Sequence, residues 1–148
     1  MKPSEIRNEL LEQHQGLRVR IEQAREVVTR CQRGEDARED LHRALVHVAD
    51  AVRMHNQREE ELMRDVLPTL DAWGHVRKEV MLEEHVVEHS EIFNALMQAT
   101  SGKDLKEAAA TALTLFEQML QHIEREEKVF LGADLLSDFG APPDTFGG

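Results

Sequence analysis

The chain has 148 residues, which is long enough to close one hydrophobic core and is typical of a single domain. It carries 18 Lys and Arg residues against 29 Asp and Glu, and the net charge of -11 argues against binding to nucleic acid or to an anionic membrane surface. Charged residues make up 32% of the chain, Tyr is absent and there are 4 prolines, a composition that favours an all-α protein over a β-sandwich.

Cysteine usage and the N-terminal sequence indicate the compartment. The chain has a single cysteine, Cys31, so it has neither an intramolecular disulfide nor a thiolate cluster that could hold a metal. Acidic residues interrupt the first twenty positions, unlike a signal peptide, and no apolar run reaches membrane-spanning length. We therefore expect a soluble, cytoplasmic protein with no membrane partner.

The first predicted helix starts near Ser4, after Pro3, and ends at Gly34. Its apolar residues recur every three or four positions and so form one buried stripe. The stripe consists of Ile6, Leu10, Leu17, Ile21, Ala24, Val28 and Cys31, and His14 completes it.

The second predicted helix follows the acidic pair Glu35-Asp36 and ends at Leu67-Pro68, because proline disfavours helical geometry in the residue before it. Its stripe consists of Leu41, Leu45, Val48, Val52, His55, Glu59, Leu62 and Val66. His55 and Glu59 thus occupy core positions, where an unpaired carboxylate is strongly destabilising. We therefore expect another group to pair with the buried carboxylate of Glu59.

Two more helices are predicted. The third runs from about residue 76 to residue 100, and its inner stripe is Leu82, His85, His89, Ile92, Leu96 and Ala99. The fourth follows the break Ser101-Gly102-Lys103, with Asp104 and Glu107 as a capping box, and ends at Leu131-Gly132. Its stripe is Ala108, Ala112, Leu115, Met119, His122, Glu126 and Val129.

These elements predict an up-down-up-down antiparallel four-helix bundle over residues 1–132, followed by a short C-terminal tail at 133–148. Counting residues from the turns places His14, His55, Glu59 and His85 at similar heights in such a bundle. The same count leaves His122 a helical turn or two away from His89, an offset that tilt or an overhanging helix start must absorb.

The polar residues of the four stripes form a candidate metal site: His14, His55, Glu59, His85, His89, His122 and Glu126. Imidazole and carboxylate ligands without thiolate suit iron, and on ligand type alone also manganese, zinc or copper. Two octahedral ions bridged by both carboxylates and by one oxide or hydroxide, with five histidines, would keep one coordination position open. With no tyrosine in the chain, that position suits a small diatomic molecule or peroxide.

Other histidines and acids near these motifs have simpler interpretations. His42, His47 and His75 fall off the stripes and are predicted to be surface residues. Glu60, Glu61, Glu84 and Glu88 are predicted to be solvated, or to orient a ligand imidazole from outside the metal site.

The spacing of the polar residues resembles that of one family. A histidine on the first helix, followed by His55-x-x-x-Glu59, His85-x-x-x-His89 and His122-x-x-x-Glu126, resembles the hemerythrin-like, or HHE cation-binding, domain from about Ser4 to Leu131. Ferritin-like bundles differ, since they use carboxylate-rich sites with Glu-x-x-His pairs.

The resemblance implies a non-heme centre of two iron ions joined by an oxo or hydroxo bridge. It places His85, His89 and His122 on one iron, His14 and His55 on the other, and Glu59 and Glu126 between them. The open position would belong to the iron that His14 and His55 hold. Oxygen-carrying hemerythrins have an aspartate five residues after the last histidine, where this chain has Glu127. The helix face favours Glu126 as the bridge, with Glu127 as the alternative.

The first functional hypothesis is binding of dioxygen or a related small ligand for sensing, storage or delivery. The alternative is an enzyme that acts on hydrogen peroxide or nitric oxide at the same position. A further alternative is iron storage or donation, although the cysteine-bearing N-terminal extension of repair-type relatives is missing, and a fourth is a purely structural bundle. The oligomeric state stays open.

Overall fold

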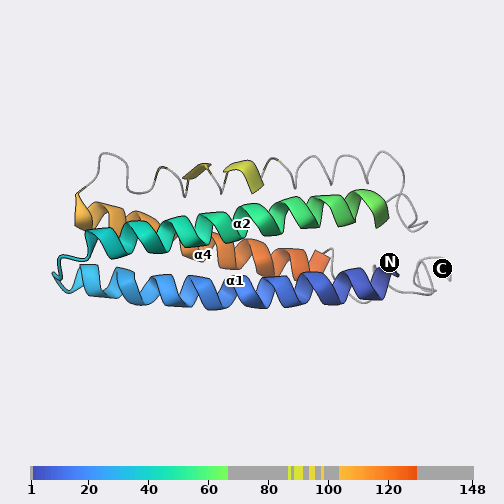
Figure 1. The fold of residues 1–148 in the computed structure, drawn as a ribbon, viewed down its shortest axis with the longest axis horizontal. Helices are drawn as coiled ribbons and strands as arrows, with labels where there is room; N and C mark the ends of the chain where they lie inside the picture. The colour runs from blue at the N-terminus through green and yellow to red at the C-terminus, as the bar shows by residue number, and fades with distance from the viewer. Residues whose placement is uncertain are drawn as a thin grey trace.

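Three long helices lie side by side in the computed structural model, which describes residues 2–66, 87, 89–91, 94–95, 98 and 104–129 (Figure 1). They are α1 (Pro3–Gln32), α2 (Arg38–Val66) and α4 (Leu105–Val129). The described residues between 87 and 98 are helical as well, and no strand occurs within the described part of the chain. The predicted all-α bundle is confirmed.

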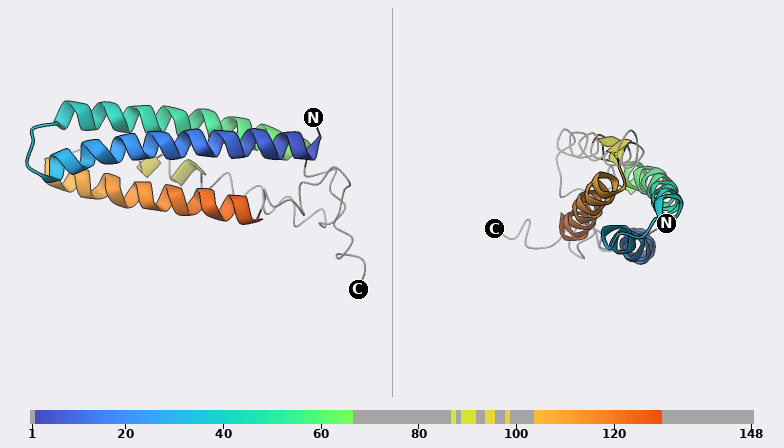
Figure 2. Two further views of the ribbon diagram at one scale, coloured as in Figure 1. Left: turned by 90° about the horizontal axis from the view of Figure 1, so that it is seen from below. Right: turned by 90° about the vertical axis from the view of Figure 1, so that its left-hand side faces the viewer.

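The helices surround a common axis. α1 runs antiparallel to both α2 and α4 and packs along each of them (Figures 1 and 2). α2 and α4 contact each other far less, as expected for helices on a diagonal of a bundle. The helical residues between 87 and 98 lie next to α2 and α4, on the side away from α1 (Figure 2).

The two ends of α1 follow from its sequence. The helix begins at Pro3, one residue earlier than predicted, because proline has no N–H to satisfy in the first turn and its φ is already helical. At the other end Gly34 takes a φ of +93°, which L side chains rarely adopt. The N–H of Gly34 donates to the Cys31 carbonyl at 3.1 Å and that of Glu35 to the Arg30 carbonyl at 3.1 Å, which completes a Schellman motif.

α4 begins as predicted. The Asp104 carboxylate accepts a hydrogen bond from the backbone N–H of Glu107 at 2.8 Å, which satisfies one of the free donors of the first turn. The predicted bounds of the third helix, the helix end at Leu67-Pro68, His75, His85 and the predicted tail at 133–148 lie outside the described residues.

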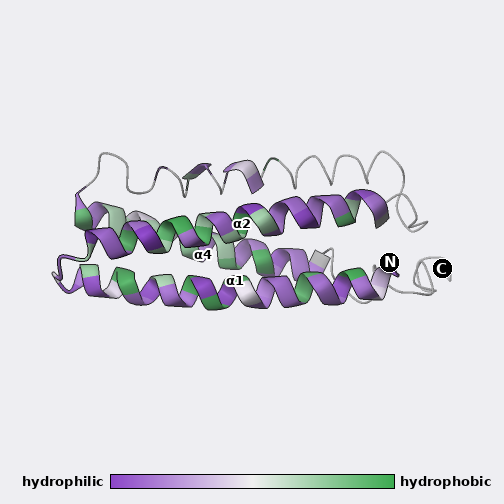
Figure 3. Ribbon diagram, viewed as in Figure 1, coloured by the Kyte–Doolittle hydropathy of each residue, from purple (hydrophilic) through white to green (hydrophobic). Residues whose placement is uncertain are grey.

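The predicted stripes form the core. Hydrophobic and hydrophilic residues alternate along each helix (Figure 3), and all the apolar stripe residues predicted for α1 are buried. Ala49, Met63, Ala109, Phe116 and Ile123 are also buried, although they fall outside the predicted stripes. The buried faces of α2 and α4 are therefore wider than a single line of every third or fourth residue, whereas the buried residues of α1 are those of its predicted stripe.

Apolar residues enclose the polar layer from both directions along the bundle. One large cluster extends from Leu17 and Val52 towards the turn between α1 and α2. Leu10 of α1 and Leu62 of α2 are buried on the opposite side of the polar residues. The candidate metal site therefore lies within the core, between two layers of buried apolar residues.

None of the described helices combines the length and the apolar character that a membrane span requires.

Two glycines give a matched test of the α1 geometry. Gly34→Ala should lower the free energy of unfolding by about 1–2 kcal/mol, since alanine is strained in the left-handed conformation. Gly16→Ala should instead raise it by about 0.8–1.0 kcal/mol, because Gly16 lies inside α1 and a Cβ there meets no atom within 4 Å. Urea unfolding of both variants measures the difference, and a shift of the same sign in both would contradict these assignments.

Candidate metal centre

Six of the seven predicted ligands are described, and all six are buried. Their ligand atoms fall into two groups, within each of which they lie no more than 4.8 Å apart. The first group is His14, His55, Glu59 and Glu126, and the second is His89, His122 and Glu126. The seventh predicted ligand, His85, lies outside the described residues.

Glu59 of α2 lies between two pairs of imidazoles. Its Oε2 lies 2.9 Å from His55 Nε2 and 3.2 Å from His14 Nε2. Its Oε1 lies 3.4 Å from His89 Nε2. The two oxygens of one carboxylate thus face different histidines.

Glu126 of α4 repeats this arrangement. Its Oε2 lies 3.5 Å from His14 Nε2, whereas its Oε1 contacts His122 Nε2 and lies 3.6 Å from His89 Nε2. Both carboxylates therefore turn one oxygen towards His14 and the other towards His89, and each also lies against the histidine of its own helix, His55 or His122. The two pairs of histidines flank the carboxylates.

The rings within each pair are in contact. The centroids of His14 and His55 are 4.8 Å apart, and those of His89 and His122 are 5.1 Å apart. His122 therefore lies at the same height as His89 in the bundle, although residue counting predicts an offset of a helical turn or two between them. The connection that precedes α4, residues 99–103, lies outside the described residues.

Two of the imidazoles are oriented by a polar side chain on their outer nitrogen. His55 Nδ1 donates to Gln13 Oε1 at 2.8 Å, and His89 Nδ1 donates to Glu60 Oε1 at 3.1 Å. Both oxygens can only accept, so each ring carries a proton on Nδ1, and its Nε2, which faces the carboxylates, can hold either a second proton or a metal cation. Glu60 was among the acids predicted to orient a ligand, whereas sequence reasoning missed Gln13.

Glu127 is turned away from the centre. Its carboxylate accepts two hydrogen bonds from Arg18, at 2.8 and 2.6 Å, and its nearest approach to His14 Nδ1 is 3.9 Å. Of the two acids that the sequence left as candidates, the structure brings Glu126 among the imidazoles and pairs Glu127 with an arginine.

The carboxylates dominate the electrostatics of the site. Burial lowers the pKa of His14, but hydrogen bonds and charge interactions with Glu126 and Glu59 outweigh it and raise the pKa to about 9. The same balance raises the pKa of His89 to about 10. Burial and Glu59 raise the pKa of Glu126. The hydrogen bonds with His122 and His14 act in the opposite direction, and the net effect lowers this pKa to about 2. The site attracts positive charge, which protons or a metal cation can supply.

Comparison with known proteins agrees with this geometry. A family model described as the hemerythrin HHE cation binding domain matches residues 5–133. The chain belongs to this family. No curated protein and no solved structure matches the chain.

The donor set of this HHE domain fits a metal cation. Imidazole nitrogens and carboxylate oxygens converge without thiolate, which suits a transition metal such as iron. His55 Nε2 is buried and lies 2.9 Å from a carboxylate oxygen, yet among the described residues it makes no hydrogen bond. A ring nitrogen that faces a carboxylate in this way is well placed to coordinate a cation between them.

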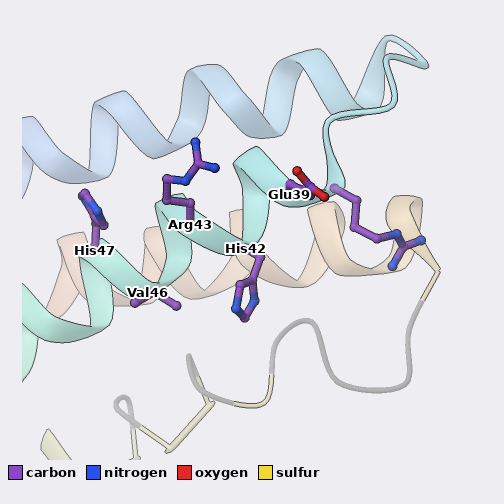
Figure 4. Close-up of a pocket in the computed structure, with 6 residues that line it drawn as sticks. Glu39, His42, Arg43, Val46 and His47 are labelled. Carbon is purple, nitrogen blue, oxygen red and sulfur yellow. The ribbon is translucent and has the colours of Figure 1, made fainter.

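Two histidines of α2 lie outside the centre, as predicted. His42 and His47 are exposed and line a surface pocket near the start of α2. Figure 4 shows their rings leaving the helix in different directions, so they do not converge on a common point.

The two neighbouring glutamates of α4 can be separated by substitution. Glu126→Gln should weaken metal binding by more than about tenfold, the lower bound for loss of an outer-shell partner, because it removes a charged ligand. Glu127→Gln should retain the metal, since its carboxylate faces Arg18. Metal analysis after dialysis against a chelator measures both. Retention in Glu126→Gln with loss in Glu127→Gln would identify Glu127 as the ligand.

The pKa values predict how the stability of protein stripped with a chelator depends on pH. The raised pKa values of His14 and His89 contribute stability that is complete below about pH 6.5 and is lost as the pH rises towards about 10. The lowered pKa of Glu126 contributes stability that is lost as the pH falls from 4.5 towards about 2. Urea midpoints of the stripped protein should therefore fall between pH 6.5 and 10, and rising midpoints over that range would contradict this assignment.

Proposed function

We propose that this HHE domain holds two iron ions bridged by Glu59 and Glu126 and binds dioxygen, or a related small ligand, at an open position of one of them. The role would be oxygen sensing, storage or delivery. The observation that supports the proposal most strongly is the orientation of the two carboxylates, each of which has one oxygen towards His14 and the other towards His89. His55 lies beside His14 and His122 beside His89, so each side of the carboxylates has two imidazoles. A single ion would not require two separate sets of imidazoles.

The uneven number of histidines supports one open position. With His85 as its third imidazole, the ion beside His89 and His122 would have one protein ligand more than the ion beside His14 and His55. The smaller set leaves room for an external ligand. Iron would supply that coordination position and the electrons for reversible binding, whereas the protein supplies the ligands, their orientation and the exclusion of water.

A small cavity beside the site supports a small ligand. Its volume is about 20 Å³, close to the space that one water-sized sphere needs. The described residues that line it are apolar except at the metal site and Asn56: Leu17, Val52, His55, Asn56, His89, Met119, His122, Ile123 and Glu126. Such a cavity admits a diatomic molecule or peroxide and excludes a large organic substrate.

Anaerobic reconstitution with ferrous iron tests the proposal. We expect about two irons per chain and a stoichiometric absorption change on exposure to oxygen that reverses when the oxygen is removed. No such reversible change would contradict oxygen binding. Rapid multiple turnover of hydrogen peroxide or nitric oxide would instead assign the site to the alternative, an enzyme.

Two histidines of the same helix provide the matched variants for this experiment. His55→Ala should lose iron from one position and abolish the oxygen response, because it removes an imidazole from the ion with the open position. His42→Ala should leave both unchanged, since His42 is exposed and outside the centre. An unaltered oxygen response in His55→Ala would show that the ligand binds elsewhere.

A further inference from the structure

The two outward-facing imidazole nitrogens have partners of different charge. His55 Nδ1 donates to the neutral amide of Gln13, whereas His89 Nδ1 donates to the carboxylate of Glu60. The two histidines lie on opposite sides of the bridging carboxylates. The difference in charge is therefore a difference between the two halves of the centre.

The amide of Gln13 is held in one orientation. Gln13 Nε2 donates to Glu9 Oε1 at 3.3 Å, so its other end, the carbonyl oxygen, faces His55. Glu9 is held in turn by Arg58, at 2.9 and 3.3 Å. This chain of contacts fixes Gln13 as an acceptor and leaves the negative charge of Glu9 paired with an arginine, one residue removed from the imidazole.

His14, the other imidazole on the same half, is likewise remote from an unpaired anion. Its Nδ1 lies 3.9 Å from Glu127, beyond hydrogen-bonding distance, and Arg18 neutralises that carboxylate through two hydrogen bonds. Neither imidazole of this half donates its outer N–H to a carboxylate, whereas His89 on the other half donates to Glu60, which has no Lys or Arg partner among the described residues.

We infer that Gln13 and Glu60 make the two metal positions unequal, with the tighter position beside His89 and His122 and the weaker one beside His14 and His55. The inference rests on the proposed centre of two ions. When a carboxylate accepts the outer N–H, the imidazole donates its electron pair to the metal more strongly, which favours a more highly charged metal ion. An amide acceptor has a smaller effect of the same kind. The position proposed to bind the external ligand is then the one that stays more easily reduced. Gln13 and Glu60 act through the imidazoles and are positioning residues.

The inference can be tested by exchanging the two partners. Glu60→Gln replaces the carboxylate beside His89 with an amide of the same shape. The double variant Glu9→Gln, Gln13→Glu places a carboxylate beside His55 and an amide at position 9. It thus exchanges the two groups, so that two carboxylates do not lie next to each other. Glu9→Gln alone is the control. Gln13, Glu9 and Arg58 line an open groove between α1 and α2, so these isosteric changes do not disturb the core.

Zinc is the probe for affinity, because imidazole and carboxylate ligands suit it and it has no redox chemistry. Titration against a competing chelator should give two steps of unequal affinity. Glu60→Gln should weaken the tighter step by about tenfold, and the double variant should strengthen the weaker step by about tenfold. Glu9→Gln alone should leave both steps in place.

Redox titration of the iron-loaded protein provides a readout that a purely structural role would not move. The wild type should show two separated reduction steps, and both Glu60→Gln and the double variant should bring these steps closer together. Two zinc ions bound with an unchanged ratio of affinities in both variants would overturn the inference and leave the proposed function intact. Binding of only one zinc ion by the wild type would contradict the proposed function itself.

Discussion

Two carboxylates buried in the core of an acidic helical bundle are the constraint on which the rest of the structure depends. Glu59 and Glu126 are 1% and 3% exposed, and the free energy of burying two such charges must be offset by positive charge between them. Histidines contributed by α1, by α2, by the helical residues around position 89 and by α4 surround them. The helices are thus joined by their ligands as well as by apolar packing.

The apolar layers on either side of the site give these charges their strength. Phe116 and the residues packed with it keep water from one side of the polar layer, and Leu10 and Leu62 keep it from the other. In such surroundings charge interactions are stronger than at a surface, which is why Glu59 and Glu126 dominate the pKa values of the imidazoles. The arrangement places a cation-attracting site within the buried core of the bundle.

The sequence predicts the candidate metal ligands much better than it predicts the residues that orient those ligands. His14, His55, Glu59, His122 and Glu126 interrupt regular apolar stripes, so helical periodicity alone places them inside the bundle. Gln13 carries no such signal, because it lies off the stripe and its role depends on the relative height of two helices and on a side-chain rotamer. Helix periodicity favoured Glu126 over Glu127 without excluding Glu127, and the contact of Glu127 with Arg18 of α1, which the sequence does not show, separates the two.

Crystals of the iron-loaded protein, measured at the iron absorption edge, test the central claim most directly. An anomalous difference map should show two separate iron peaks, close enough to share one bridging oxygen, with one oxygen of Glu59 and one of Glu126 bound to each peak. His14 and His55 should bind one peak, and His89 and His122 the other. A single peak, or two peaks with either carboxylate bound through both oxygens to the same ion, would contradict the account.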